Sequence, residues 1–183
     1  MKKRLLGAAM CVLACGSSYA ERADALKKIL VEADSSVMNM VSQGAKAEGN
    51  VVLTRGTLIM KAGKLDAVSD PQGYKFVTLL AAPGALATFR QKRDGGPDLW
   101  VEGEAEKIEY DDKSDIVKLT GRAKVKNLDG ARVTNGAEGQ FISYDSRKEE
   151  FNAVNNESGK GKVGGGRVQI IIDQPRTPAP GKQ

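Results

Sequence analysis

Short stretches in which apolar and polar residues alternate make up most of this chain. The alternation is clearest after Gly49, where Val51 and Leu53 share one face of a predicted strand and Val52 and Thr54 share the other. Turn-forming sequences separate the stretches, at residues 70–73, 82–84, 93–98, 111–113 and 129–130. Because no segment carries a convincing amphipathic-helix period, the pattern predicts an all-β sandwich, jelly roll or barrel.

The predicted strands are short and follow one another through the whole chain. Residues 167–172 form the most β-prone run, since they end in three consecutive isoleucines and contain no proline. At this length a single domain is expected, and we place it at residues 21–174. In the second half of the chain the other predicted strands cover residues 100–105, 107–110, 116–119, 123–125, 141–144 and 151–154.

The stretch that begins at Gly49 has an echo that begins at Gly121, a shift of 72 residues (121 − 49). In both places alternating apolar residues follow the glycine, then a polar turn, then more alternation. The echo suggests that one supersecondary unit is used twice. Aligning the flanks requires a two-residue gap, which sets Val31 on Val101 and the pair Met38 and Met40 on the pair Ile108 and Tyr110.

The two ends of the chain differ from the rest. Residues 2–4 are basic, an apolar run extends from Leu5 to about Cys15, and Ser18-Tyr19-Ala20 follows, which together predict a secretory signal peptide over residues 1–20, cleaved after Ala20. A lipoprotein signal ending at Cys15 is the alternative, but Leu13 fits that pattern poorly. Residues 175–183 contain prolines and polar residues, which predicts a disordered tail.

Removal of the signal changes the charge and the cysteine count. The formal net charge falls from +5 to +2, because Lys2, Lys3 and Arg4 leave (5 − 3). Cys11 and Cys15 also leave, so the mature chain forms no disulfide in an oxidising compartment. With one Trp and no block of like charge, the mature chain offers little to nucleic acid.

The sequence offers little for catalysis. It has no histidine, which removes histidine triads, histidine bases and histidine metal ligands, and we predict no catalytic residue, no metal site and no cofactor. Glu102, Glu104 and Glu106 alternate and could imitate a paired-carboxylate hydrolase, but a solvated outer strand face explains them more simply. Residues 159–164 match G-x-G-x-x-G, yet a strand follows them where the nucleotide fold needs a helix, so a loop is favoured.

An ordered set of short motifs runs through the chain: Met38-Asn-Met40, Gly49-Asn-Val51, Gly56-Thr-Leu58, Lys61-Ala-Gly-Lys-Leu65, Pro83-Gly-Ala-Leu-Ala-Thr-Phe89, Gly103-Glu-Ala105 and Val117-Lys-Leu-Thr-Gly-Arg-Ala123. In this order the motifs resemble those of the OstA-like family of periplasmic lipopolysaccharide-transport proteins. The resemblance covers roughly residues 29–154. Three departures are Gly63, where the family usually has an acid, Arg122, where it commonly has Asn, and a Gly-rich segment at residues 135–140.

The resemblance implies an open, twisted β-jellyroll: two facing antiparallel sheets, built from two similar halves, with an apolar groove between them. It implies that the mature protein is periplasmic and not inserted in a membrane. It further implies that acyl chains of lipopolysaccharide lie in the groove, that copies stack head to tail through edge strands, and that LptC and the N-terminal domain of LptD are partners.

The inward phase of the alternation supplies the candidate groove residues. Their simpler interpretation is an ordinary sandwich core, and the sequence alone does not separate the two; a general lipid- or glycan-binding module and a structural adaptor therefore stay open. The predicted partner-binding edge consists of Val31, Val168, Ile170 and Ile172. The candidate lipid-binding residues are Ile29, Val31, Met38, Met40, Val51, Leu53, Leu58, Met60, Phe89, Ile108, Tyr110, Leu119, Val125 and Phe141.

Overall fold

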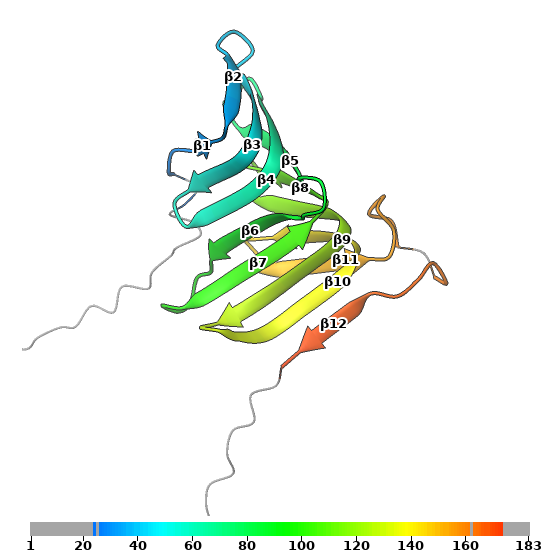
Figure 1. Cartoon of the computed structure of the whole chain (residues 1–183). Coiled ribbons are helices and arrows are strands. Elements are labelled where there is room, and N and C mark those ends of the chain that lie inside the picture. The colour runs from blue at the N-terminus through cyan, green and yellow to red at the C-terminus, as the bar shows by residue number, and fades with distance from the viewer. Residues whose placement is uncertain (1–23, 25, 162, 174–183) are drawn as a thin grey trace, which may run out of the picture.

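The computed structural model describes residue 24, residues 26–161 and residues 163–173; the predicted signal peptide and the predicted tail lie outside them. The described residues form antiparallel strands, which confirms the all-β prediction (Figure 1). In chain order the strands are β1 (Leu30–Glu32), β2 (Ser35–Asn39), β3 (Gly44–Arg55), β4 (Leu58–Ser69), β5 (Lys75–Leu80), β6 (Ala87–Lys92), β7 (Leu99–Ala105), β8 (Lys107–Asp111), β9 (Ile116–Asp129), β10 (Arg132–Asp145), β11 (Glu150–Val154) and β12 (Gln169–Ile172).

The four long strands β3, β4, β9 and β10 bend midway, and each contributes one half to each of two facing sheets. Sheet 1 has the order β2, β3, β4, β5, β8, β9, β10, β11. Sheet 2 has the order β1, β3, β4, β6, β7, β9, β10, β12. Because every strand of one sheet has a counterpart in the other, the molecule is a sandwich whose strands stack from β1 and β2 at one end to β11 and β12 at the other (Figure 1).

The bends depend on left-handed backbone at two matching places. Gly49 and Asn50 have φ of 79° and 45°, and Gly121 and Arg122 have φ of 77° and 49°. Glycine is favoured at such angles because it has no Cβ. At the second bend a Cβ on Gly121 would lie 2.7 Å from the Glu106 carboxylate, so side-chain crowding as well as backbone conformation selects glycine there.

An acid closes each bend in the same way. The Asp34 N–H donates to the Gly49 carbonyl over 2.9 Å, and the Glu106 N–H donates to the Gly121 carbonyl over 3.0 Å. Asn50 donates to the Asp34 side chain at 2.9 Å, as the following residue of the second bend, Arg122, does to Glu106 at 2.8 Å. The two bends are therefore copies of one device.

The repeat is real, and its shift of 72 residues holds without a gap. The pairs of β2 with β3 reappear 72 residues later as the pairs of β8 with β9, and those of β1 with β3 reappear as those of β7 with β9. The two-residue gap is therefore wrong: Met38 corresponds to Tyr110, and Val31 corresponds to Gly103. Apolar alternation alone could not reveal this, because a shift of two preserves the face that each residue occupies.

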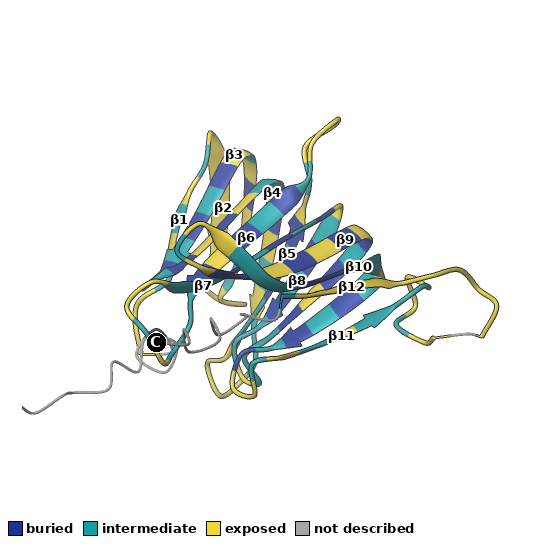
Figure 2. Ribbon diagram, turned by 90° about the horizontal axis from the view of Figure 1, so that it is seen from below, coloured by how far each residue is buried: buried dark blue, intermediate teal, exposed yellow. Residues whose placement is uncertain are grey.

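The core lies between the two sheets. Buried positions alternate with more exposed ones along the strands, as Figure 2 shows. Phe89 of sheet 2 and Tyr144 of sheet 1 stack across the interior, with their ring centroids 6.3 Å apart. Burial of each large side chain contributes about 1.5–3 kcal/mol to folding, so this interior is the main source of stability.

Opposite the bends, the hairpin turns of the two sheets face each other along what we call the seam. Sheet 2 contributes the β3–β4, β6–β7 and β9–β10 turns, and sheet 1 contributes the β4–β5, β8–β9 and β10–β11 turns. Asp24 lies over the first of these turns and accepts a hydrogen bond of 2.9 Å from the Thr57 N–H. Among the described residues, no helix is long and apolar enough to cross a membrane.

Candidate functional site: the apolar interior, its two open ends and its seam

Most of the candidate groove residues do point into the interior. Ile29 and Val31 are partly buried and pack against the core. Lipid contact at these positions stays a prediction, because the interior is filled by the protein's own side chains. The fully inward members of the set, each 6 % exposed or less, are Val51, Leu53, Leu58, Met60, Phe89, Ile108, Tyr110, Leu119 and Val125.

The inward placement of Phe141 is wrong. A register shift in β10 lies between Gly139 and Phe141, so Ile142, paired with Leu119, takes the inner position. Phe141 faces outward, where Gly159 of the loop before β12 packs against its ring. The simple alternation failed here because the strands bend at this point: β9 advances three residues, from Thr120 to Ala123, while β10 advances two, from Gly139 to Phe141. The buried positions of β10 are Ala137 before the bend and Ile142 after it, an odd spacing that regular alternation does not follow.

Among the candidate groove residues, Met38 and Met40 differ from the others because they are exposed, and lipid contact at both stays a prediction. Met38 is 63 % exposed and Met40, in the β2–β3 turn, is 76 % exposed. Met38 pairs with Ala45 of β3, which places it on the interior side of sheet 1, but β2 is the last strand of that sheet. Its side chain therefore continues the inner face beyond the part that sheet 2 covers.

The interior also contains residues that the sequence analysis did not select. Ile142 and Tyr144 are fully buried in β10, beyond the bulge. Their alternation, with a polar residue between them, was the signal that could have found them. Other buried members outside the candidate set are Ala47, Leu65, Val77, Leu79, Ala87, Val101, Ala105, Val117, Ala123 and Ala137.

Exposed apolar side chains gather at the two ends of the sandwich. At the β12 end Ile170 is 61 % and Ile172 is 69 % exposed, and at the other end Met38 is similarly open. Among the described strands, β12 pairs only with β10 and β1 pairs only with β3, so each has an unpaired edge. The predicted edge residues Val31, Val168, Ile170 and Ile172 thus lie in or next to edge strands at opposite ends of the molecule.

Charged and hydroxyl side chains of the two sheets meet at the seam. Arg55 of sheet 2 forms an ion pair with Asp112 of sheet 1 and donates to the Tyr110 hydroxyl at 2.9 Å. Burial lowers the pKa of Arg55, but its hydrogen bond to Asp112 and the nearby acidic groups outweigh this and raise it. Burial raises the pKa of the Tyr110 hydroxyl, although Arg55 opposes the shift. The Arg55 guanidinium therefore stays charged and the Tyr110 hydroxyl stays protonated at neutral pH.

A second ion pair crosses the seam nearby. Arg93, in the β6–β7 turn of sheet 2, pairs with Glu149 in the β10–β11 turn of sheet 1. The sequence analysis selected none of these charged residues. For Arg55 a signal existed, since it continues the inward phase of Val51 and Leu53; Arg93 lies in a turn and gave none.

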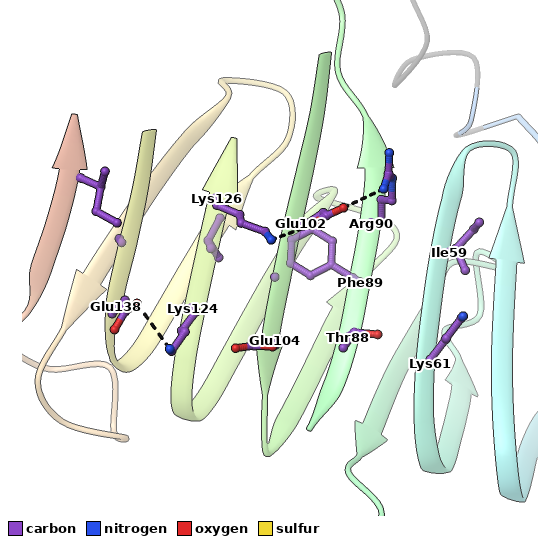
Figure 3. Close-up of a pocket in the computed structure, with 14 residues that line it drawn as sticks. Ile59, Lys61, Thr88, Phe89, Arg90, Glu102, Glu104, Lys124, Lys126 and Glu138 are labelled. Atoms are coloured by element: carbon purple, nitrogen blue, oxygen red, sulfur yellow. Dashed lines mark hydrogen bonds and ion pairs between the residues drawn. The ribbon is translucent and has the colours of Figure 1, made fainter. Parts of the chain in front are cut away.

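The outer face of sheet 2 carries a ladder of charges over a hollow of about 520 Å³, shown in Figure 3. Glu102 pairs with Arg90 at 2.8 Å and with Lys126 at 3.0 Å. Glu102 and Glu104 lie on this face as predicted, whereas Glu106 sits at the bend between β7 and β8. In the described part of the chain, no cluster of three or more acids has the geometry of a metal site.

The G-x-G-x-x-G match at residues 159–164 lies in the loop between β11 and β12, as the sequence analysis favoured. In the described residues that follow, the chain enters β12 rather than a helix. The described residues after the motif therefore provide no helix N-terminus whose backbone N–H groups could bind a pyrophosphate.

Comparison with known proteins agrees with the architecture. The chain is 29 % identical over 182 residues to "Lipopolysaccharide export system protein LptA" of Haemophilus influenzae, covering 100 % of this chain and 98 % of that relative. It is 30 % identical over 155 residues to the protein of the same name from Escherichia coli K12, covering 85 % of this chain and 76 % of the relative.

A solved structure shares the fold. It is LptH of Pseudomonas aeruginosa, described as the LptA homologous periplasmic component of the lipopolysaccharide transport device, with a TM-score of 0.69, 24 % identity and coverage of 82 % of this chain and 99 % of that one. The family described as "LptA/(LptD N-terminal domain) LPS transport protein" matches residues 30–150. Since that match spans well over half of the chain, this protein belongs to the LptA/LptD N-terminal-domain family of lipopolysaccharide transport proteins.

Proposed function

We propose that this protein is an exported, non-enzymatic carrier that moves lipopolysaccharide through the periplasm, with the acyl chains held between sheet 1 and sheet 2. The observation that supports it best is an apolar row that runs the whole length of the sheet 1 inner face. The row starts at exposed Met38, continues through Ala67, Val77 and Tyr110, and reaches Phe151 in the last strand. Acyl chains need such a row, since it makes no demand for hydrogen bonds.

The interior is full in this structure, so lipid enters as the sheets separate along the seam. The bends stay intact in that motion, because the continuous strands β3, β4, β9 and β10 hold them together. Side chains such as Met60 and Leu53 then exchange contacts with each other for contacts with acyl chains. The relatives named as lipopolysaccharide export proteins support this choice of ligand.

The internal repeat supports head-to-tail stacking and gives it a register. Inside the molecule, β5 and β6 cover β8 and β7. In the repeat, β2 is the equivalent of β8 and β1 is the equivalent of β7. At the other end, β11 and β12 pair with β10 in the way that β5 and β6 pair with β4. β11 is therefore the equivalent of β5, and β12 is the equivalent of β6. Stacking β11 and β12 of one copy on β2 and β1 of the next would repeat the internal joint.

Transferring the internal pairs gives the expected contacts of that joint. Phe89 pairs with Gly103 inside the molecule, and the equivalent pair at the joint is Ile170 of one copy with Val31 of the next. Val77 pairs with Tyr110, and the equivalent pair at the joint is Phe151 of one copy with Met38 of the next. The joint would thus bury Met38 and Ile170, two of the most exposed apolar side chains.

The same edges suit related partners. The family description covers the N-terminal domain of LptD, so that domain is expected to offer an equivalent edge to β11 and β12. We assign LptC to the opposite edge, β1 and β2. Stacked copies and partners would then form one continuous apolar path.

A cross-link tests the register directly. The internal pair Thr88–Glu104 transfers to Gln169 of one copy and Glu32 of the next, so Glu32→Cys with Gln169→Cys should form disulfide-linked oligomers. Mature protein has no other cysteine if cleavage follows Ala20. The matched control, Glu32→Cys with Ile171→Cys, is displaced by two residues and should cross-link far less. Equal cross-linking of both variants, or a monomer at every concentration, would favour a lipid-binding module without joints.

A photo-cross-linker tests the ligand. Placed at inward Phe89, it should label lipopolysaccharide in cells, and placed at Val52, on the opposite face of β3, it should not. Labelling from Val52 alone would contradict an interior path. Absence of labelling from both, with oligomers intact, would point to a structural adaptor.

A further inference from the structure

Two ion pairs hold the sandwich closed at the place where lipid would enter. Arg55 is the last residue of β3 and Arg93 lies in the β6–β7 turn, so both belong to sheet 2. Their partners Asp112 and Glu149 lie in turns of sheet 1. The β3–β4 and β6–β7 turns are neighbours, because the Lys92 N–H donates to Thr57 Oγ1 over 3.2 Å. They form one rim with two guanidinium groups.

These seam pairs are much more buried than an ordinary surface pair. The side chains of Arg55 and Asp112 are 7 % and 12 % exposed, and Arg93 is 15 % exposed, whereas the pair Arg122–Glu106 at the second bend is 62 % and 54 % exposed. A buried guanidinium that loses its carboxylate is left as an uncompensated charge, which is strongly unfavourable. When the seam opens, each guanidinium gains water or another anion in place of its carboxylate, so the opened rim offers a binding site for an anion.

The rim has polar capacity that the protein itself does not use. The Arg93 Nε and the Asn127 Oδ1 atoms are buried and have no hydrogen-bond partner among the residues that the structure describes. Asn127 lies on the inner side of sheet 2, two residues before the end of β9, and Gln91, on the same inner side of β6, is also buried. Unpartnered buried polar atoms are uncommon in folded proteins. A ligand with several acceptor and donor oxygens would satisfy them.

The cross-section of the sandwich is thus amphipathic. Its interior is apolar towards the bends, where Ala105 and Ala123 are buried, and polar towards the seam. A ligand that fits both parts has hydrocarbon on one side and an anionic, hydroxyl-bearing group on the other. Phosphate is an anion of this kind that guanidinium binds well, because the planar fork makes two parallel hydrogen bonds to it.

Building on the proposed function, we propose that Arg55 and Arg93 form a phosphate-binding rim, in which the phosphate groups of a phosphorylated glycolipid replace Asp112 and Glu149 when the seam opens. In the protein without lipid, the carboxylates of Asp112 and Glu149 occupy the positions that the phosphate groups take. Asn127 accepts a hydrogen bond from a sugar hydroxyl of the same ligand.

Two probes and two charge changes test the rim. Lipopolysaccharide and phosphatase-treated lipopolysaccharide are each titrated onto the mature protein, and the dissociation constants are compared. The unmodified protein should bind the phosphorylated form about tenfold more tightly, the effect of one hydrogen bond between charged groups. Arg93→Gln should lose that preference and keep its affinity for the dephosphorylated form. Glu149→Gln should bind the phosphorylated form more tightly, since the competing carboxylate is gone.

Arg122→Gln is the matched control. It removes the same charge on the opposite side of the molecule, at a residue with left-handed backbone where glutamine meets the same constraint. It should keep the tenfold preference. Arg93→Lys, which keeps the charge but not the fork, should give an intermediate preference. If thermal unfolding shows that Arg93→Gln does not fold, the Glu149→Gln titration decides.

The outcomes separate this inference from the proposed function. A preference that survives Arg93→Gln, or a Glu149→Gln variant with no gain for the phosphorylated lipid, overturns the rim. If both lipids bind the unmodified protein equally well, the rim fails while lipid carriage stands; if neither binds, the carrier itself fails. Inorganic phosphate, added as a competitor, tells whether the rim takes phosphate from any source or only phosphate that is attached to lipid.

Discussion

The first and second copies of the repeat differ in what covers them. β8 pairs with β5, and its Tyr110 is 6 % exposed. β2 has the same register on its own long strand, but none of the described strands lies beyond it, and its Met38 is 63 % exposed. The unit is thus used once as an interior joint and once as an end. The comparison teaches that a free edge in this molecule has the geometry of a joint that already exists inside it.

The largest effect is expected from giving the buried copy the residue of the exposed one. Ile108, fully buried, corresponds to exposed Ser36, so Ile108→Ser should destabilise the fold by about 4 kcal/mol through lost packing and a buried hydroxyl. Urea unfolding measures it. The reverse change, Ser36→Ile, should leave the stability of the monomer nearly unchanged and strengthen self-association. A loss of stability from Ser36→Ile comparable to that from Ile108→Ser would contradict the difference in cover.

The next effect concerns the two bends. Gly121→Val should cost about 3 kcal/mol, since a β-branched residue is strained at φ of 77° and its side chain would crowd Glu106. Gly49→Val should cost less, because Asp34 precedes an edge strand that can move. Gly73→Ala, at φ of 92° with open space around it, controls for the backbone term alone and should cost about 1 kcal/mol. Denaturant midpoints of the three variants rank these costs, and a larger loss at Gly49 than at Gly121 would be evidence against the free edge.

The smallest effect is expected from a substitution that makes the second bend resemble the first. Arg122→Asn matches Asn50, removes an exposed ion pair with Glu106 and places a residue that tolerates left-handed backbone at φ of 49°. The two terms oppose each other, so the free energy of unfolding should change by no more than about 0.5 kcal/mol. A change above about 1 kcal/mol would mean that the ion pair contributes more at the bend than its exposure suggests.

Part of the site could be foreseen and part could not. Val51, Leu53, Leu58 and Met60 follow unbroken alternation and lie inside, as predicted. Phe141 was misplaced because a bulge has no mark in a hydrophobicity pattern. The seam pairs were missed because each joins residues that are far apart in the chain, 57 residues for Arg55 and Asp112 and 56 for Arg93 and Glu149.

The sequence by itself determined the strands, the inward face of most of them, the glycines of the bends and the existence of a repeat, since each depends on neighbouring residues and their period along the chain. Only the tertiary structure decided which copy of the repeat is covered, that Met38 is open while Tyr110 is not, and that charges meet across the seam. Cover and charge pairing depend on which distant strands lie together, and identical alternation is compatible with either outcome.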